Sequence, residues 1–259
     1  MEAAFFDLDK TVIAKTSLIA YAPTLRKTGY LSFPMALRTA WGHLLFKFFG
    51  ADEESLEKAR KTALRLATGM NQQAMKRLVR DNLTEVIEPI VYDDALDLIE
   101  EHRQEGRLLV LVSASPTEIV EPLAEHLDID DFIATTPVVD SEGRYTGEVE
   151  FYAEGSHKAE AIIDLALRKD ISLENSWAYS DSSTDIPMLE LVGNPVAVNP
   201  DRELKKQAEE KNWPILEFVR PIALGDRVPL NRKWIAVTIL TFLLGAGIVK
   251  TFKRFRSIN

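Results

Sequence analysis

Short apolar runs alternate with longer amphipathic stretches along most of the chain. Residues 3–6 form an uninterrupted apolar run that ends at Asp7, which predicts a buried strand with an acidic side chain at its carboxyl end. Residues 108–112 form a second run, which is apolar and β-branched. Shorter strands are predicted at residues 132–135, 177–180, 195–198 and 215–218. Continuous apolar runs of this length are typical of parallel strands that are covered on both faces.

The segments between these strands have the spacing of amphipathic helices, with apolar residues every three or four positions. Helices are predicted over residues 93–103, 116–126, 158–168, 185–192 and 202–211. Residues 137–153 instead alternate around the turn residues 140–143, which predicts a β-hairpin. The alternation of strands and helices beyond residue 90 predicts an α/β fold, a Rossmann-like, doubly wound parallel sheet with helices on both faces.

A long helical pattern interrupts this alternation between about residues 17 and 87. It includes a predicted helix over residues 35–49, which is rich in aromatic side chains and is opened by Pro34. We therefore expect a catalytic core made of residues 1–15 and 90–224, with an all-helical domain, residues 16–89, inserted into it.

The C-terminal region has a different composition. Residues 234–249 are apolar and uncharged, and basic residues flank them on both sides. A helix that spans a bilayer needs roughly 20 apolar residues, a length reached if residues 250–252 extend the run. We expect a hydrophobic helix over residues 234–252, joined through a linker at residues 225–233, that anchors the chain in a membrane. The alternatives are a helix lying in the membrane interface and a helix buried against protein.

Composition and charge narrow the choice of partners. The 259 residues carry a formal net charge of −9, so the chain repels nucleic-acid phosphates and we expect no nucleic-acid partner. The absence of cysteine excludes disulfides and thiolate metal sites. No basic stretch precedes the apolar N-terminal run, so no signal peptide is predicted and the domain before the C-terminal helix is expected in the cytoplasm. The oligomeric state is left open.

Asp7 and Asp9 are the first candidates for catalysis, in the run FFDLDKT at residues 5–11. Ligands of α/β folds bind beyond the carboxyl ends of the strands, where this pair is expected. One carboxylate can attack phosphorus and form an aspartyl-phosphate, and the other can protonate the leaving oxygen and then activate water. Two adjacent negative charges also favour a hard cation such as Mg²⁺. Alone, the pair is equally consistent with a turn or a helix cap.

Further candidates follow predicted strands or open predicted helices. Ser113 ends the second strand, where its hydroxyl and the backbone amides that begin the next segment can bind a phosphate oxygen. Lys158, at a helix start, can pair with Asp7 and neutralise a phosphoryl group. After the strand at 177–180, Asp181 can complete the ligand set of a cation, while Asp185 can hold a metal-bound water or a neighbouring group. Each residue alone is also explained as a helix cap or a surface residue.

In combination and in this order, these motifs make the sequence resemble the haloacid dehalogenase superfamily. The first motif is similar to residues 7–11, the second to Ser113, the third to Lys158 and the fourth to Asp181 and Asp185. The helical insertion between the first two motifs resembles the C1 cap of subfamily IB, the phosphoserine-phosphatase-like branch. The resemblance covers residues 3 to about 220.

The resemblance implies a Mg²⁺-dependent phosphatase that acts through an aspartyl-phosphate. It implies that Asp7 is the nucleophile and Asp9 the general acid and base. The Mg²⁺ ligands would be the Asp7 carboxylate, the Asp9 backbone carbonyl and Asp181. The phosphoryl group would be bound by Ser113, Ala114 and Lys158, with Thr11 and Asp185 in supporting positions.

The chain departs from the family pattern at two places. Phosphoserine phosphatases carry a glutamate soon after the nucleophile that binds the substrate ammonium, whereas residues 14–18 contain no acid, which argues against phosphoserine. Ser180 and Ser182 flank Asp181 where glycines are usual. The substrate is left open between a small phosphomonoester and a lipid-linked phosphate. Alternatives to hydrolysis are phosphotransfer to an acceptor other than water and a catalytically silent, membrane-associated interaction module.

Overall fold

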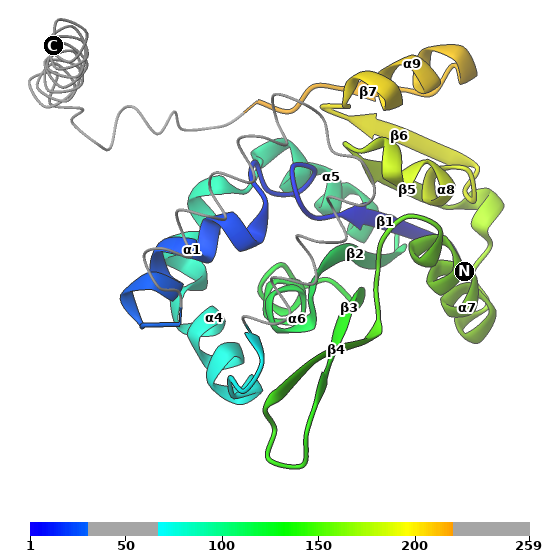
Figure 1. Cartoon of the computed structure of the whole chain (residues 1–259). Coiled ribbons are helices and arrows are strands. Elements are labelled where there is room, and N and C mark those ends of the chain that lie inside the picture. The colour runs from blue at the N-terminus through cyan, green and yellow to red at the C-terminus, as the bar shows by residue number, and fades with distance from the viewer. Residues whose placement is uncertain (31–66, 220–259) are drawn as a thin grey trace, which may run out of the picture. The chain divides into compact units, whose positions relative to one another are not determined.

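The computed structural model describes residues 1–30 and 67–219 (Figure 1). The predicted helix at 35–49, the linker at 225–233 and the hydrophobic helix at 234–252 lie outside the described residues. Within residues 1–30 and 67–219, no helix combines the length and the apolar character that crossing a membrane requires.

A sheet of seven strands forms the centre of the fold, in the order β4-β3-β2-β1-β5-β6-β7. All neighbouring strands are parallel except β3 and β4, which form an antiparallel hairpin. The strands are β1 (Ala3–Asp7), β2 (Leu108–Pro116), β3 (Asp131–Val139), β4 (Tyr145–Phe151), β5 (Trp177–Ser180), β6 (Asn194–Val198) and β7 (Ile215–Leu216). From β1 the chain first adds β2 and β3 on one side of the sheet and later adds β5 on the other side. The strand order therefore reverses at β1, and sheets of this kind bind ligands beyond the carboxyl ends of the strands at such a switch point.

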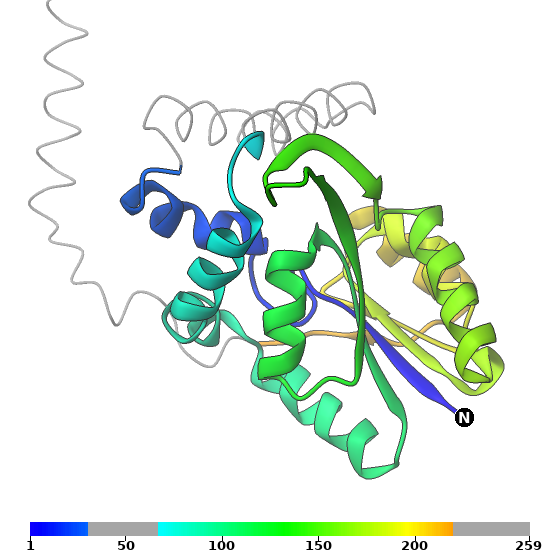
Figure 2. The same cartoon turned by 90° about the horizontal axis from the view of Figure 1, so that it is seen from below.

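Helices cover both faces of this sheet (Figure 2). The helices of the described residues are α1 (Ser17–Lys27), α4 (Gln72–Val86), α5 (Asp93–Gln104), α6 (Thr117–His126), α7 (Ser156–Lys169), α8 (Ile186–Leu189) and α9 (Arg202–Lys211). Short 3-10 turns lie at Glu88–Ile90, Leu173–Asn175 and Ser183–Asp185.

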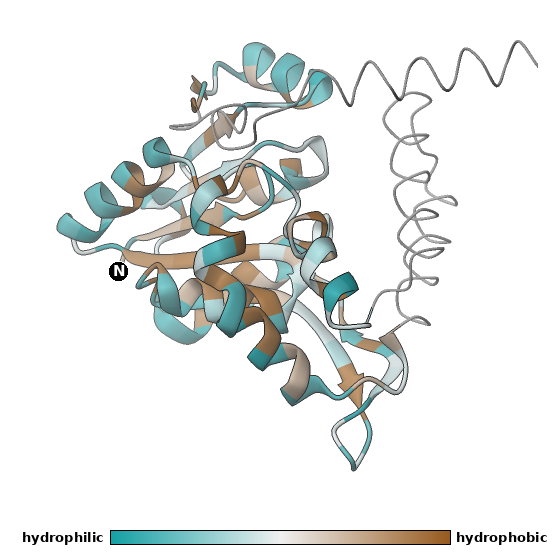
Figure 3. Cartoon of the chain, turned by 90° about the vertical axis from the view of Figure 1, so that its left-hand side faces the viewer, coloured by the Kyte–Doolittle hydropathy of each residue, from teal (hydrophilic) through white to brown (hydrophobic). Residues whose placement is uncertain are grey.

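The strand side chains divide between two apolar clusters because successive residues of a strand point to opposite faces. Ala4 and Phe6 of β1 pack on one face with residues of α4, α5 and α6. Ala3 and Phe5 pack on the other face with residues of α7, α8 and α9. Figure 3 shows the same division as hydrophobic strands in the interior and hydrophilic outer helix faces. The predicted doubly wound parallel sheet is confirmed.

Several predicted elements have different bounds in the structure. Strand β2 continues past the predicted end at residue 112 to Pro116, because its pairing with β3 resumes after a register shift between Ser113 and Pro116. The predicted short strand at 132–135 and the first arm of the hairpin are one strand, β3. The helix predicted over 185–192 is a 3-10 turn followed by the short α8, and β7 is shorter than predicted.

Helices α1 and α4 are the described parts of the predicted insertion at 16–89. Apolar residues of α4, including Leu78 and Val79, belong to the same apolar cluster as the sheet residue Phe6. A row of polar contacts also joins α4 to α6, one helical turn apart, and we call it the α4–α6 ladder. Its rungs are Gln72–Glu118 at 2.8 Å, Lys76–Glu121 at 2.6 Å and Arg80–Glu125 at 2.9 Å.

Candidate active site

The tight turn that follows β1 places the first pair of carboxylates. Asp7 is the last residue of β1, and the backbone amides of residues 11–13 all donate to the carbonyl oxygen of Leu8. Lys10 within this turn has a φ of 68°, a left-handed conformation that a residue with a Cβ rarely adopts. Such backbone strain is concentrated at functional sites.

Lys158 joins two carboxylates that come from different strand ends. Its Nζ donates to Asp7 Oδ1 over 2.6 Å and to Asp185 Oδ2 over 2.8 Å. Ser180 Oγ, at the end of β5, donates to the same Asp185 oxygen over 2.7 Å. All four side chains are buried, and the lysine enters from the first turn of α7, after Gly155 with its positive φ of 57°. The sequence-based pairing of Lys158 with Asp7 is therefore present, and Asp185 holds the lysine as its neighbouring group.

The charges of this cluster do not balance. Burial alone would lower the pKa of Lys158, but the charges of Asp7 and Asp185 together outweigh it and raise the lysine pKa above its ordinary value. The lysine therefore stays an ammonium. Burial raises the pKa of Asp7, and although Lys158 opposes this shift, Asp185 and Asp181 add to it. One ammonium does not compensate the surrounding carboxylates, so the site favours a further cation.

Asp181 lies directly beyond β5, next to the end of β1 in the sheet. Burial raises its pKa to about 6, although Lys10 at 3.5 Å lowers it. Lys10 is largely exposed and reaches the carboxylate from the turn after β1. The carboxyl ends of β1 and β5 thus bring Asp7 and Asp181 into one acidic cluster.

Asp9 is held by groups from two other elements. The backbone amide of Ser17, the first residue of α1, donates to Asp9 Oδ1 over 2.9 Å. Ser115 Oγ donates to Asp9 Oδ2 over 3.2 Å. Burial raises the pKa of Asp9, while these hydrogen bonds oppose the shift. A carboxyl group that holds its proton more tightly than usual suits the role of a general acid.

Ser113 and Ala114 lie at the register shift of β2, where the strand leaves regular pairing with β3. Bulges of this kind occur next to active sites because they re-aim side chains and backbone groups. Ser113 Oγ accepts from the Ser115 amide over 3.1 Å, which uses an oxygen lone pair and not the hydroxyl proton. Thr135 Oγ1 donates to the Ala114 carbonyl over 2.7 Å and fixes this segment against β3.

The structure therefore gathers the predicted residues at one end of the sheet, with Thr11 beside them. Thr11 is buried, and its Oγ1 has no hydrogen-bond partner among the described residues. Sequence reasoning missed the contacts of Lys10, Ser17 and Ser115. Lys10 and Ser115 lie within the first and second motifs, so their positions in the sequence could have indicated a place near the site. Nothing in the local sequence distinguishes Ser17.

The donor set fits Mg²⁺ better than a metal that needs many protein ligands. No group of three or more His, Asp or Glu side chains within the described ranges is arranged to hold a metal ion. Mg²⁺ retains several waters and is commonly bound through one or two carboxylates. Asp7 and Asp181 supply two buried carboxylates with raised pKa values, which is the chemistry expected of such a site.

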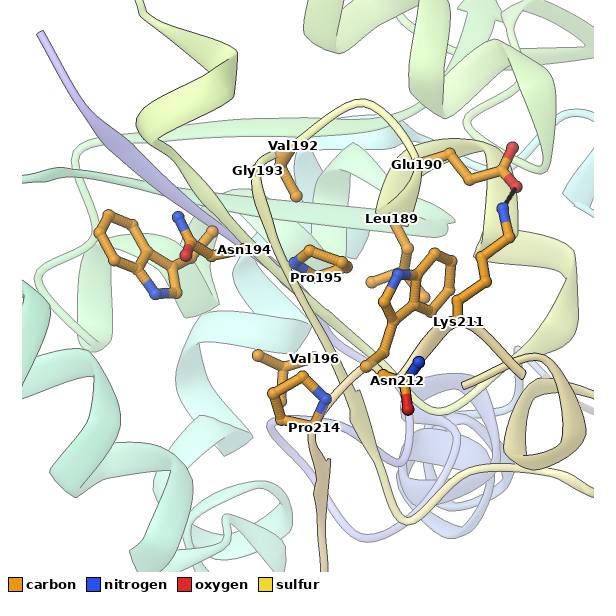
Figure 4. Close-up of a pocket in the computed structure, with 12 residues that line it drawn as sticks. Leu189, Glu190, Val192, Gly193, Asn194, Pro195, Val196, Lys211, Asn212 and Pro214 are labelled. Carbon is orange, nitrogen blue, oxygen red and sulfur yellow. Dashed lines mark hydrogen bonds and ion pairs between the residues drawn. The ribbon is translucent and has the colours of Figure 1, made fainter. Parts of the chain in front are cut away.

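A surface pocket of about 760 Å³ lies elsewhere, at the amino ends of β5 and β6 and before β7 (Figure 4). Pro195, Val196 and Pro214 line it, and an ion pair between Glu190 and Lys211 borders it. These strand ends are opposite to those that carry Asp7 and Asp181. The pocket is therefore separate from the acidic cluster.

Comparisons with known proteins identify the family of this chain. Residues 4–190 match the family model for haloacid dehalogenase-like hydrolases. A Streptomyces azureus protein named for inhibition of morphological differentiation is 48% identical over 227 residues, covering 88% of this chain and 82% of that protein. A Mycobacterium tuberculosis protein named phosphoserine phosphatase is 31% identical, covering 83% of this chain and 70% of that protein. A Neisseria meningitidis histidinol-phosphatase is also 31% identical, covering 83% of this chain and 98% of that protein.

A solved structure shares the fold. The crystal structure of a Bordetella pertussis protein of unknown function has a TM-score of 0.72 and 27% identity, covering 83% of this chain and 97% of that one. The family model covers more than half of the sequence, and relatives along most of its length are named phosphatases. This chain belongs to the haloacid dehalogenase-like hydrolase family and is a phosphatase of that family.

Proposed function

We propose that the chain hydrolyses phosphomonoesters through an aspartyl-phosphate formed on Asp7, with Mg²⁺ as its cofactor. The contact of 2.6 Å between Lys158 Nζ and Asp7 Oδ1, buried at the end of β1, is the observation that carries the proposal. An ammonium in this position orients the nucleophile and supplies positive charge where phosphoryl oxygens would gather.

The first half-reaction transfers the phosphoryl group to the enzyme. A carboxylate oxygen of Asp7 attacks phosphorus while the bond between phosphorus and the leaving oxygen breaks. Asp9 gives its proton to that leaving oxygen and becomes a carboxylate. Ser113 and Lys158 bind the phosphoryl oxygens, together with the backbone amide of Ala114.

The second half-reaction releases inorganic phosphate. Asp9, now a carboxylate, takes a proton from a water molecule as the water oxygen attacks phosphorus. The bond between phosphorus and Asp7 breaks, so that Asp7 is again a carboxylate and Asp9 is again protonated. Both half-reactions thus use the same two side chains.

Mg²⁺ would be held by the carboxylates of Asp7 and Asp181 and by the backbone carbonyl of Asp9. When bound, it supplies positive charge that offsets the buried carboxylates and stabilises charge on the phosphoryl group. Burial raises the pKa of both Asp7 and Asp181, and a cation beside them would stabilise their charged forms, which supports this assignment.

The substrate is a phosphomonoester whose identity the insertion at 16–89, acting as a cap, would select. Two relatives of equal identity carry the names of different substrates, phosphoserine and histidinol phosphate. The first turn of α1 contains no acidic residue, so a substrate ammonium has no carboxylate partner there. We therefore expect O-phosphoserine to be a poor substrate, and we keep both small-molecule and lipid-linked phosphates as candidates.

The apolar segment at 234–252 supports a further part of the proposal, namely that the catalytic domain is anchored to the cytoplasmic side of a membrane. The length of the apolar run, close to that of a bilayer-spanning helix, carries the anchoring. The linker at 225–233 would connect the anchor to the core.

Phosphate release tests the catalytic proposal. The full-length protein with Mg²⁺ should release phosphate from p-nitrophenyl phosphate, and Asp7→Asn should abolish the release. Asp128→Asn is the matched control, because Asp128 is an exposed aspartate distant in sequence from every motif. Full activity of Asp7→Asn would refute the nucleophile assignment.

A substrate panel and product analysis extend this test. O-phosphoserine, histidinol phosphate and a lysophospholipid phosphate, compared with Asp7→Asn as the blank, would separate the candidate classes. Added alcohols would reveal phosphotransfer, because a new phosphate ester would then appear in place of inorganic phosphate.

A further inference from the structure

Two serine hydroxyls form a continuous hydrogen-bonded chain that ends on Asp9. Ser115 Oγ donates to Asp9 Oδ2 over 3.2 Å, and Ser17 Oγ lies 2.7 Å from Ser115 Oγ. A hydroxyl has one proton, and that of Ser115 is used toward Asp9. When Asp9 accepts as a carboxylate, the proton between the two serines comes from Ser17, and the chain runs from Ser17 through Ser115 to Asp9.

Ser17 contacts Asp9 a second time through its backbone. The Ser17 amide donates to Asp9 Oδ1 over 2.9 Å. This amide belongs to the first turn of α1, where N–H groups have no partner within the helix, and the helix dipole favours a negative charge there. Both oxygens of Asp9 are thus engaged, one by α1 and one by β2.

Ser115 also contacts the phosphate-binding segment. Its backbone amide donates to Ser113 Oγ over 3.1 Å, so one residue touches both the proposed acid and the proposed phosphate ligand. Ser17 and Ser115 are buried, which means that water does not replace these hydrogen bonds when a serine is removed.

We propose that Ser115, supported by Ser17, is a positioning residue that fixes the orientation of the Asp9 carboxyl group for proton transfer. The inference rests on the proposed roles of Asp7 and Asp9. Ser17 begins the first helix of the insertion at 16–89, so the same contacts make the orientation of the acid depend on how α1 is seated against the core. A small misplacement of a catalytic group is enough to reduce the rate strongly.

Two aryl phosphates that differ by one nitro group separate this role from a structural one. Phenolate leaves poorly without a proton, whereas nitrophenolate leaves without one, so only phenyl phosphate depends fully on the acid. The measured quantity is kcat/KM, which reports on formation of the aspartyl-phosphate. Ser115→Ala should lower kcat/KM about tenfold for phenyl phosphate and less than about threefold for p-nitrophenyl phosphate. The tenfold loss is smaller than the roughly 10²-fold or more that a general acid contributes, because the acid is misaligned and not removed.

Three further variants complete the experiment. Ser115→Thr keeps the hydroxyl and should restore much of the phenyl phosphate activity. Asp9→Asn combined with Ser115→Ala should be no slower than Asp9→Asn alone, because the serine acts through the acid. Thr117→Ala is the control, since it removes a nearby hydroxyl that donates to the Thr135 carbonyl and should leave the ratio of the two substrates unchanged.

The outcomes distinguish a failure of the positioning role of Ser115 from a failure of the proposed phosphatase function. Equal losses on both substrates after Ser115→Ala, or an additive loss in the double variant, would overturn the positioning role while leaving Asp7 as nucleophile. A wild-type protein that hydrolyses neither substrate with Mg²⁺ would overturn the proposed function and this inference with it.

Discussion

Lys158 and Asp7 are 151 positions apart in the sequence, yet Lys158 Nζ donates to Asp7 Oδ1 over 2.6 Å. The same ammonium donates to Asp185 over 2.8 Å, so a single buried cation serves two carboxylates. Neither carboxylate has another cation within ion-pair distance in the described part of the chain. The lysine is thus both a proposed phosphate ligand and the electrostatic centre of the folded site.

Removing this lysine should destabilise the protein strongly. Lys158→Met leaves two buried carboxylates without their cation, and breaking such a buried pair costs about 3–5 kcal/mol of unfolding free energy. Urea unfolding without Mg²⁺ measures the loss. Lys76→Met is the control, because it removes a partly exposed pair with Glu121 and should cost about 1 kcal/mol or less.

The double variant Lys158→Met with Asp185→Asn refines this prediction. It removes one of the two uncompensated charges, so it should be more stable than Lys158→Met alone. A double variant less stable than the single variant would show that charge imbalance is not the cause of the destabilisation.

Mg²⁺ should stabilise the wild-type protein, and Asp181→Asn should remove most of that stabilisation. A ligand that binds only the folded state raises stability by about 2.7 kcal/mol at 100 times its dissociation constant. The melting temperature, measured with and without Mg²⁺, reports the effect, and Asp128→Asn should respond like the wild type.

The same variant should behave differently without metal. The pKa of Asp181 is raised to about 6 in the folded protein, so its ionisation above that pH opposes folding. Asp181→Asn should therefore melt higher than the wild type at pH 7.5 in the presence of a chelator. A lower melting temperature under these conditions would contradict the burial argument.

His102 should make stability fall in mild acid. Arg107 can only donate, so His102 Nδ1 accepts from it over 2.9 Å and Nε2 carries the proton that faces Tyr179 at 2.7 Å. Burial lowers the pKa of His102 to about 4, with Arg107 adding to the shift. Between this value and the ordinary histidine pKa of about 6.5, His102 is protonated in the unfolded chain but neutral in the folded protein. The free energy of unfolding therefore falls as the pH drops from about 6.5 to about 4.

Unfolding free energies between pH 7.5 and pH 4.5 measure this slope. His102→Asn should remove this contribution, so that it loses less stability in acid than the wild type does, whereas His126→Asn, at a partly exposed helix end, should behave like the wild type. An unchanged slope in His102→Asn would assign the acid sensitivity to other groups.

Gly193→Ala should destabilise the fold by direct contact. A Cβ at this position would lie 1.7 Å from the backbone carbonyl oxygen of Glu174, so the backbone must shift. Overpacking of this kind costs typically about 1–3 kcal/mol or more. Gly106→Ala is the comparison, since a Cβ there has no atom within 4 Å and only the φ of 71° opposes it, at roughly 1–2 kcal/mol. Equal losses in thermal unfolding would refute the steric explanation.

Deletion of residues 231–259 tests the membrane anchor. The full-length protein should sediment with membranes after cell lysis, and the truncated protein should remain in the supernatant with its phosphatase activity intact. Full-length protein found only in the supernatant would refute the anchor and leave the catalytic proposal unaffected.

The sequence predicted the central architecture well because local patterns determine it. The bounds of β5 and α9 match the predicted 177–180 and 202–211, since clear turn and capping residues limit both elements. The predicted end of β2 was wrong because pairing with β3 after the bulge extends the strand, and no local pattern encodes that pairing.

The candidate site likewise contains residues that the sequence predicted and contacts that it could not predict. Residues in recurring motifs, such as Asp7 and Lys158, were predicted, and the sheet brings them together. The contact between Ser17 and Ser115 joins residues 98 positions apart and follows from how α1 sits against β2. Such a contact depends on tertiary packing and could not be predicted from one sequence.

The α4–α6 ladder defines where this protein can be recombined with its relatives. Its three rungs join α4, which belongs to the predicted insertion, to α6, the helix that follows the proposed phosphate-binding segment. A chimera that imported a foreign insertion together with its own α4 would place mismatched side chains against Glu118, Glu121 and Glu125. Exchanges of substrate-selecting segments should therefore keep α4 and α6 from the same parent, or transfer both helices as one unit.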